Sequence, residues 1–452
     1  MSSTISTPSS QSAERPFPFA IRWLNAPVLL TLMTLLQLGW LGVIWLTGAT
    51  AATYKLLPLI ILTIVLGTAV TLLPDRFLRW LPFNESGLAR SETRILLLAG
   101  LLIGISLIIF ASQQRVWAFD EEGNIRAATV VAQDGIGELF ENYDRRPWLG
   151  KQHPPLVPII YGLGMRVIGV SQLAARSITV VFALGTGWLT YLIGRRLFNR
   201  QTALLAALLL FTFPLVFRLG AAAMVETPLT FFFTLTVFLA LRLAERPSAA
   251  RLLWVGLAFG AGLLSKYTMV FALPLVFGII TVRGSFKQAV RYFSLMGIIG
   301  ALLLAGWLLF ANQLDILQRQ VSTIMEYAGL VLTTEYGRQV LFETMSNRLP
   351  SALGVYNLPL LAVGGLFVLK RRQPVDWVLL FWILSVWLPL SLTLPDHRYF
   401  LPSFPAIALM AALGLQQIPK GMARGLLLAL LLGGSTLYLY VDWVRAAELF
   451  VK

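Results

Sequence analysis

Cysteine is absent from this 452-residue chain, and histidine occurs only twice. The lack of cysteine excludes a disulfide framework, a thiol nucleophile and any metal site built on thiolate ligands. Charged residues are also scarce, at 13% of the chain, whereas soluble domains contain about 25%. Together with 57% hydrophobic residues and a mean hydropathy of +0.75, this scarcity is typical of a protein that crosses a membrane several times.

Acidic residues are fewer than basic ones, 21 against 36, which leaves a formal net charge of +15. A surplus of this size also occurs in proteins that bind nucleic acids. Here the bases stand in short clusters between apolar segments, as the cytoplasmic anchors of membrane proteins do. We therefore expect membrane lipids as surroundings and no nucleic-acid partner.

Apolar segments recur along the chain, and about 17–25 apolar residues are enough to cross a bilayer as a helix. They predict an all-α polytopic integral membrane protein. About thirteen spans are expected, at residues 27–48, 56–74, 95–112, 177–194, 201–217, 226–242, 252–265, 267–282, 292–312, 350–369, 377–394, 399–417 and 425–441. The segment 154–170 carries Arg166 and begins with two prolines, so we expect it to lie at the membrane interface without crossing.

The placement of Lys and Arg predicts which side each loop faces. If 154–170 does not cross, the short basic connections all fall on one side, and the positive-inside rule makes that side cytoplasmic. These connections contain Arg195, Arg242, Arg283 and Lys370. The N-terminus is then cytoplasmic, the C-terminus lies outside, and the expected location is the plasma (inner) membrane.

Composition predicts four parts of the chain. Residues 1–23 are rich in Ser and Thr and are expected to form a disordered cytoplasmic N-terminus. The other expected parts are two additional N-terminal helices in 24–94, a catalytic core in 95–418 with outer loops 113–175 and 313–349, and a last helix with a short outer tail in 419–452.

The longest polar stretch, Trp117–Leu156, follows the uncharged run Ile95–Ser112. Asp120 and Glu121 stand where the chain leaves the membrane. A carboxylate at such a boundary is partly desolvated and still faces water, which suits proton transfer. The alternative is a solvated loop with ordinary surface charges.

Other ionisable residues lie near the membrane boundaries of the same outer face, where such groups usually face a cavity or a partner. They are Lys151, His153, Arg176, Arg218, Glu226, Lys266, His397 and Arg398. This mixture fits a phosphate-linked sugar, since cations hold phosphate and a carboxylate takes the proton of the attacking group. His153 could equally be a hydrogen-bonded loop residue, and Arg398 an interface anchor. No spacing of ligands is specific for a structural metal site.

Seven short motifs then occur in one order: FDEEGN, GKQHPPL, AARS, GRRLFNR, METPLTFF-like Met224–Phe233, GLLSKY and HRYFLPSFPA. The series resembles the polyprenyl-phosphate-sugar glycosyltransferases of the GT-C fold. It is most similar to the glycosyltransferase family 39 type, which includes protein O-mannosyltransferases and the bacterial aminoarabinose transferase. The resemblance covers about residues 95–415.

The resemblance implies catalytic roles for Asp120, Glu121 and Glu226, with Asp120 acting as base or placing the acceptor. Where the family usually has Lys-Pro-Pro-Leu, this chain has His153 before the prolines and Lys151 two positions earlier. Either residue could meet the donor phosphate.

The resemblance also implies phosphate contacts from Lys266 and from the element that contains His397 and Arg398. The expected reaction moves a sugar from a polyprenyl-phosphate donor to a lipid, glycan or protein acceptor, by a single inverting displacement on the extracytoplasmic side. No cofactor is expected, and the need for a divalent metal is left open. A transporter or flippase for a lipid-linked sugar is the alternative, although the inverted repeats frequent in transporters are not seen.

Overall fold

The computed structural model describes residues 90–113, 118–141, 143, 153–354 and 357–418, together with the isolated positions 65 and 69. Lys151 and the expected segments 1–23, 27–48 and 425–441 lie outside the described residues, as does 56–74 apart from those two positions. The chain forms two compact units, Met1–Leu98 and Ala99–Lys452. The second unit contains every candidate site residue, and its structure follows.

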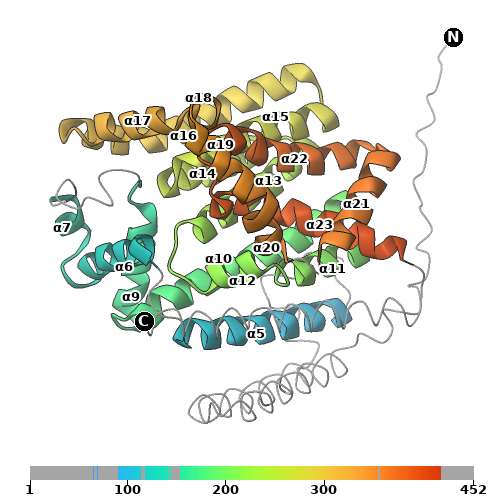
Figure 1. The fold of residues 1–452 in the computed structure, drawn as a ribbon, viewed down its shortest axis with the longest axis horizontal. Helices are drawn as coiled ribbons and strands as arrows, with labels where there is room; N and C mark the ends of the chain where they lie inside the picture. Colours follow the sequence, from blue (N-terminus) through green and yellow to red (C-terminus); the bar gives the residue numbers. More distant parts are fainter. Residues whose placement is uncertain are drawn as a thin grey trace. The chain divides into compact units, whose positions relative to one another are not determined.

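All regular elements in the described ranges are helices (Figure 1). They are α5 (Arg90–Gln113), α6 (Ala118–Gln133), α7 (Ile136–Glu141), α9 (Leu156–Ile168), α10 (Gln172–Leu197), α11 (Arg200–Leu210), α12 (Pro214–Gly220), α13 (Glu226–Glu245), α14 (Ala249–Ser265), η1 (Tyr267–Phe271), α15 (Ala272–Arg283), α16 (Phe286–Gln313), α17 (Ile316–Tyr327), α18 (Leu330–Thr333), α19 (Glu335–Glu343), η2 (Thr344–Arg348), α20 (Leu349–Leu353), α21 (Leu358–Arg371), α22 (Pro374–Leu392), η4 (His397–Ser403) and α23 (Phe404–Gln417). The all-α prediction is thereby confirmed.

Six helical segments in the described ranges are long and apolar enough to cross a membrane. They are Glu92–Ser112, Gln172–Leu197, Glu226–Glu245, Phe286–Gln313, Pro374–Leu392 and His397–Gln417. Two sharply bent helix pairs would raise the number to eight. The chain is therefore an integral membrane protein, and the expected total of about thirteen spans stays a prediction.

Capping residues explain where several helices begin. The side chains of Ser171, Asn199, Ser248 and Ser285 each accept a hydrogen bond from a backbone N–H three residues on, at the starts of α10, α11, α14 and α16. The expected break at Lys266 is present, because its extended backbone ends α14 before η1 begins.

Two expected spans are interrupted rather than straight, since 350–369 is divided between α20 and α21 and 201–217 is bent. The segment 201–217 consists of α11 and α12, which meet at an angle of 67°. Pro214 occupies the first turn of α12, where its missing N–H costs nothing, whereas inside a longer helix it would remove a hydrogen bond. The polar loop expected at 313–349 is also more ordered than anticipated, since it contains α17, α18 and α19.

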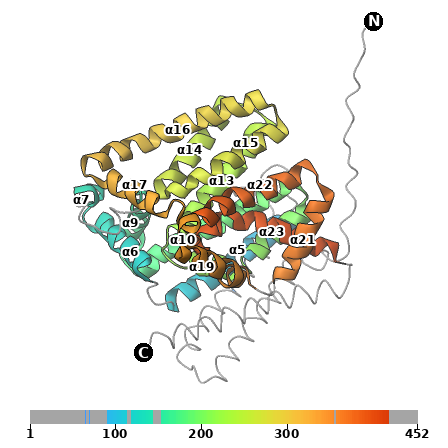
Figure 2. The same cartoon turned by 45° about the horizontal axis from the view of Figure 1, so that its top comes forward.

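Helix α13 lies at the centre of the described helices and packs against α10, α14 and α15. Helix α14 packs along α16 (Figure 2), and α23 packs against both α11 and α21. Glycine allows the closest of these approaches. A Cβ atom added to Gly364 of α21 would lie 2.0 Å from the Met410 carbonyl oxygen of α23.

Helices α6 and α9 pack together beside α10 and share a buried cluster that includes Val131, Tyr161 and Met165. Helix α9 has 13 residues and is therefore about 20 Å long, which is too short for a span. This length agrees with the expectation that 154–170 does not cross. The arrangement brings the start of α6 toward the start of α13.

Candidate active site

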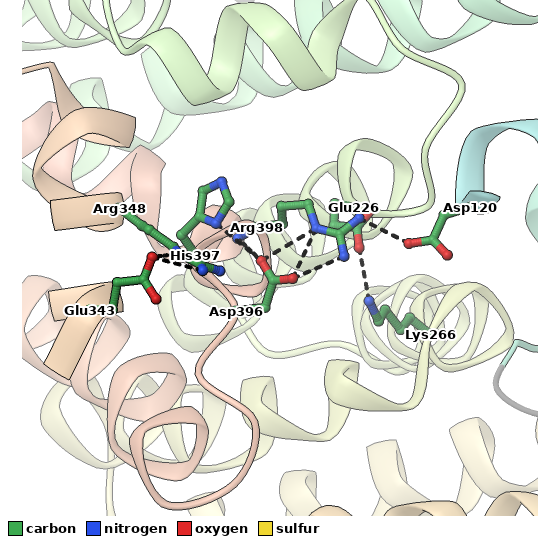
Figure 3. Close-up of polar contacts among 8 residues, drawn as sticks. All are labelled: Asp120, Glu226, Lys266, Glu343, Arg348, Asp396, His397 and Arg398. Atoms are coloured by element: carbon green, nitrogen blue, oxygen red, sulfur yellow. Dashed lines mark hydrogen bonds and ion pairs between the residues drawn. The ribbon is translucent and has the colours of Figure 1, made fainter. Parts of the chain in front are cut away.

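Arg398 joins two carboxylates from distant parts of the chain (Figure 3). Its Nη1 lies 2.9 Å from Oδ2 of Asp120 in α6, and its Nη2 lies 2.9 Å from Oδ2 of Asp396. Asp396 also caps η4, because its Oδ1 accepts a hydrogen bond from the backbone N–H of Arg398 at 3.0 Å. The guanidinium is therefore held in a fixed orientation between the two acids.

Glu226 and Lys266 form a second, buried ion pair beside the first (Figure 3). Lys266 Nζ donates to Oε1 of Glu226 at 2.9 Å, and the two side chains are 11% and 2% exposed respectively. The same Nζ lies 3.8 Å from the centre of the Tyr399 ring, within the range of a cation–π interaction. Tyr399 follows Arg398 in η4, so the ring joins the two ion pairs into one cluster.

His153 is buried next to this cluster, just before α9. Its backbone carbonyl accepts a hydrogen bond from the Tyr143 hydroxyl at 2.7 Å. Burial, followed by the charge of Lys266, lowers the pKa of His153 to about 3, although the charges of Glu226 and Asp120 act in the opposite direction. The imidazole is therefore neutral at pH 7, which makes it a hydrogen-bonding group there and not a cation.

Asp396 stays ionised despite its partial burial. Burial raises the pKa of this carboxyl, but the hydrogen bond with His397 and the charge of Arg398 outweigh that effect and hold the pKa below its usual range. His397 Nδ1 lies 3.2 Å from Asp396 Oδ1. His397 thus contacts the cluster through Asp396.

The cluster lies at one end of the helices that carry it. Glu226 begins α13, Lys266 follows the end of α14, and Arg398 lies at the start of the η4–α23 segment. The opposite end of α13 carries Glu245, which pairs with Arg196 and Arg283. The ionisable residues of the cluster therefore gather at one end of these helices and not in their middle, and the side of the membrane that this end faces stays a prediction.

Glu121 and Arg176 form a separate pair behind Asp120. They are 0% and 2% exposed, with Arg176 Nε 2.8 Å from Glu121 Oε1. Both carboxylate oxygens of Glu121 accept hydrogen bonds from Arg176. Arg218 lies in α12. Of the residues predicted for the site, Asp120, His153, Glu226, Lys266, His397 and Arg398 belong to the cluster, whereas Glu121 pairs with Arg176 instead.

Sequence reasoning missed Asp396 and Tyr399. The signal for Asp396 was its place directly before His397 and Arg398, where an acid next to two bases can cap a helix and orient an arginine. Tyr399 lies within the HRYFLPSFPA motif but was not selected as a site residue, because an aromatic residue at a membrane boundary is ordinary.

Within the described ranges, no group of three or more His, Asp or Glu side chains is placed to hold a metal ion. The Asp120, Asp396 and Glu226 carboxylates are each paired with a cationic side chain instead. A cluster of this kind can bind an anionic group through Lys266 and Arg398 and accept a proton at a carboxylate.

Comparison with solved structures identifies the fold. The chain is similar to ArnT from Cupriavidus metallidurans bound to undecaprenyl phosphate, with a TM-score of 0.52 and 14% identity over 72% of this chain and 60% of that one. It is also similar to the oligosaccharyltransferase of Archaeoglobus fulgidus in the apo form, with a TM-score of 0.53 and 14% identity over 81% of this chain and 56% of that one. The chain has the GT-C fold.

Sequence comparison covers a shorter part of this GT-C chain. Residues 152–310 match the family model described as dolichyl-phosphate-mannose-protein mannosyltransferase. An uncharacterized protein of Aquifex aeolicus (strain VF5) is 31% identical over 158 residues, which are 34% of this chain and 31% of that protein. The chain thus spans about a third of this relative and about 60% of ArnT. The matched segment contains His153, Arg176, Glu226 and Lys266, whereas Asp120 and Arg398 lie on either side of it.

Proposed function

We propose that this protein is a membrane glycosyltransferase that moves a sugar from a polyprenyl-phosphate donor to a hydroxyl group of a lipid, glycan or protein acceptor. The observation that carries the proposal is the cluster in which Arg398 contacts Asp120 while Lys266 contacts Glu226, at one end of the helices of a GT-C fold. ArnT has this fold in a structure with bound undecaprenyl phosphate. Active-site residues outside the membrane core suit a lipid donor whose headgroup reaches the extracytoplasmic side of the plasma (inner) membrane.

Asp120 acts as the general base in this proposal. Its side chain is 34% exposed, so an acceptor hydroxyl can reach it. The carboxylate accepts the hydroxyl proton, and the acceptor oxygen bonds to the anomeric carbon of the sugar. The bond from that carbon to the phosphate oxygen breaks, and the lipid phosphate leaves with the electron pair. A single displacement of this kind inverts the anomeric centre.

Lys266 and Arg398 stabilise the departing phosphate. Their ion pairs with Glu226 and Asp396 hold them in place before the donor arrives, and fixed charges of this kind stabilise developing charge without reorganisation. The phosphate leaves as a stable anion, so little acid catalysis is needed. The neutral His153 can hydrogen-bond a sugar or phosphate oxygen without adding charge. No step in this mechanism uses a metal ion.

The transfer assay with Asp120→Asn tests the base. Purified protein in liposomes is incubated with radiolabelled polyprenyl-phosphate sugars, and transfer to added lipid and peptide acceptors is measured. Asparagine keeps the size of the side chain but cannot accept the proton, so turnover should fall by about 10²–10⁴-fold while donor binding persists. Glu122→Gln is the matched control, because the Glu122 side chain is half-exposed and pairs with Arg126 on α6. Full turnover by Asp120→Asn at equal protein level would assign the base to another residue.

Lys266→Ala tests the phosphate contact. Hydrogen bonds to charged groups are worth about 1.5–3 kcal/mol, so donor affinity should fall roughly tenfold to a hundredfold. Arg283→Ala is the control, since Arg283 forms an ion pair of the same length, although less buried, with Glu245 at the other end of α13. Equal donor affinity in both variants would make Lys266 a structural residue only.

The transporter alternative receives some support from the bent pair of α11 and α12, because broken helices are frequent in transporters. The members of the ionisable cluster lie at the ends of other helices, and none of them belongs to α11 or α12. Liposomes distinguish the two functions, since a transporter moves the lipid-linked sugar between leaflets without forming a new glycosidic bond.

A further inference from the structure

The segment 221–225 connects α12 to α13 and places Glu226. It has no regular helix, and all five of its residues are buried. A buried peptide group costs free energy unless it finds a hydrogen-bond partner. Side chains from other elements therefore decide where this segment lies, and with it the first residue of α13.

Helix α6 holds this segment at Ala223 from two directions. Oε1 of Glu121 accepts a hydrogen bond from the Ala223 N–H at 2.8 Å, and Nδ2 of Asn124 donates to the Ala223 carbonyl oxygen at 3.0 Å. Glu121 and Asn124 are three residues apart, so they lie on the same face of α6. Asp120 immediately precedes Glu121 on that helix. The two hydrogen bonds at Ala223 thus connect the helix that carries Asp120 to the segment that leads into Glu226.

Arg176 keeps Glu121 in this position. Its guanidinium donates to Oε1 at 2.8 Å and to Oε2 at 3.0 Å, and its Nη1 donates to the Ala111 carbonyl oxygen at 2.7 Å. The Glu121 carboxylate is therefore held by α10 on one side and by Ala223 on the other. Turning this carboxylate away would leave the buried charge of Arg176 without its partner, which costs free energy.

A third element fixes the next residue of the segment. The Tyr161 hydroxyl of α9 donates to the Met224 carbonyl oxygen at 2.9 Å and accepts a hydrogen bond from Thr179 of α10 at 2.9 Å. Consecutive carbonyl groups thus bond to α6 and α9, the two helices that pack together next to the cluster.

We propose that Asn124 is a positioning residue that acts with Glu121 and Tyr161 to fix the distance between the Asp120 and Glu226 carboxylates. This inference rests on the proposed glycosyltransferase function. The acceptor, held at Asp120, and the donor phosphate, held at the Glu226–Lys266 pair, react only when they are correctly spaced. A displacement of about 1 Å can lower a rate by about a hundredfold.

The test compares two buried asparagines. Asn124→Leu removes the side-chain donor to the Ala223 carbonyl oxygen with little change in size. Asn357→Leu is the control, because it removes a side-chain donor to a different backbone oxygen, the Leu353 carbonyl. Both asparagines are 0% exposed. We expect both variants to lose thermal stability. Only Asn124→Leu should lower kcat, by about tenfold to a hundredfold, with the donor KM changed less than threefold because Lys266 and Arg398 are intact.

Tyr161→Phe supplies a second, gentler variant in case Asn124→Leu does not fold. It removes one hydroxyl group, and kcat should again fall while the donor KM holds. Unchanged kcat in folded Asn124→Leu or Tyr161→Phe, next to an active unmodified protein, would overturn the positioning role alone. An equal loss of kcat in Asn357→Leu would also overturn it, because the effect would then be a general one of stability. No transfer by the unmodified protein would instead overturn the proposed function on which the inference rests.

Discussion

At the scale of single residues, the state of His153 has a measurable effect on stability. Its pKa is about 3 in the folded protein and 6.5 in the reference state. Between these values the unfolded chain binds a proton that the folded protein excludes. The free energy of unfolding must therefore fall as the pH falls below about 6.5, by about 1.4 kcal/mol per pH unit from this group. Asp396, whose pKa is lowered, loses its contribution only at more acidic pH.

The variant that tests this effect is His153→Gln, which replaces the imidazole with an amide that does not titrate. When the pH falls from 7 to 5, the variant should lose about 2 kcal/mol less of its free energy of unfolding than the unmodified protein. Thermal unfolding in detergent at the two pH values measures this difference. If stability changes with pH in parallel in the two proteins, then His153 of the folded protein takes up its proton between pH 7 and pH 5 as the unfolded chain does.

Residue patterns predicted which ionisable residues form the cluster better than they predicted the residues that support it. Asp120, Glu226, Lys266 and Arg398 were selected because each is an ionisable residue next to an apolar segment, and the structure brings these four together. Their individual roles stay predictions. The partner of Glu121 is 55 residues away in Arg176, and no local pattern reports a contact between two residues so far apart.

At the scale of elements, helix packing depends on glycines that local patterns do not distinguish. Gly364 of α21 and Gly414 of α23 face each other, and a Cβ on Gly414 would lie 2.3 Å from the Leu360 carbonyl oxygen. Backbone atoms cannot move aside as a flexible side chain can. Gly414→Ala should therefore destabilise the protein by about 1–3 kcal/mol. Gly297→Ala on α16 is the control, since nothing lies within 4 Å of its added Cβ. Similar melting temperatures for both variants would show that α21 and α23 separate easily.

Helix positions were predictable because apolar length and capping residues are local properties. The segment 226–242 appears as α13, and the break at Lys266 was expected. The bend between α11 and α12 was missed because most of the surrounding residues are apolar, so only Pro214 marked it. The helices within 313–349 were missed because the charged residues of this segment were interpreted as a polar loop.

At the scale of the whole molecule, the sidedness of the membrane protein stays a prediction that cysteine labelling can test. The native chain has no cysteine, so each introduced thiol is the only one. Gln133 ends α6 and Gln339 lies in α19, whereas Gln373 precedes α22 next to the basic end of α21. Cysteines at 133 and 339 should react with an impermeant thiol reagent in intact cells, and a cysteine at 373 should react only after lysis. Reaction at 373 without lysis would reverse the orientation.

The hydrogen bonds from α6 to the Ala223 backbone also affect the order in which parts of the chain fold during synthesis. During synthesis, Glu121 leaves the ribosome 55 residues before Arg176, and Asn124 leaves it 99 residues before Ala223. Until those partners arrive, both side chains remain hydrated, and α6 cannot dock against the segment that precedes α13. The region around Asp120 can therefore close only after residue 223 has been synthesised. A ribosome stalled before residue 223 would carry an inserted chain whose α6 is still open to a protease.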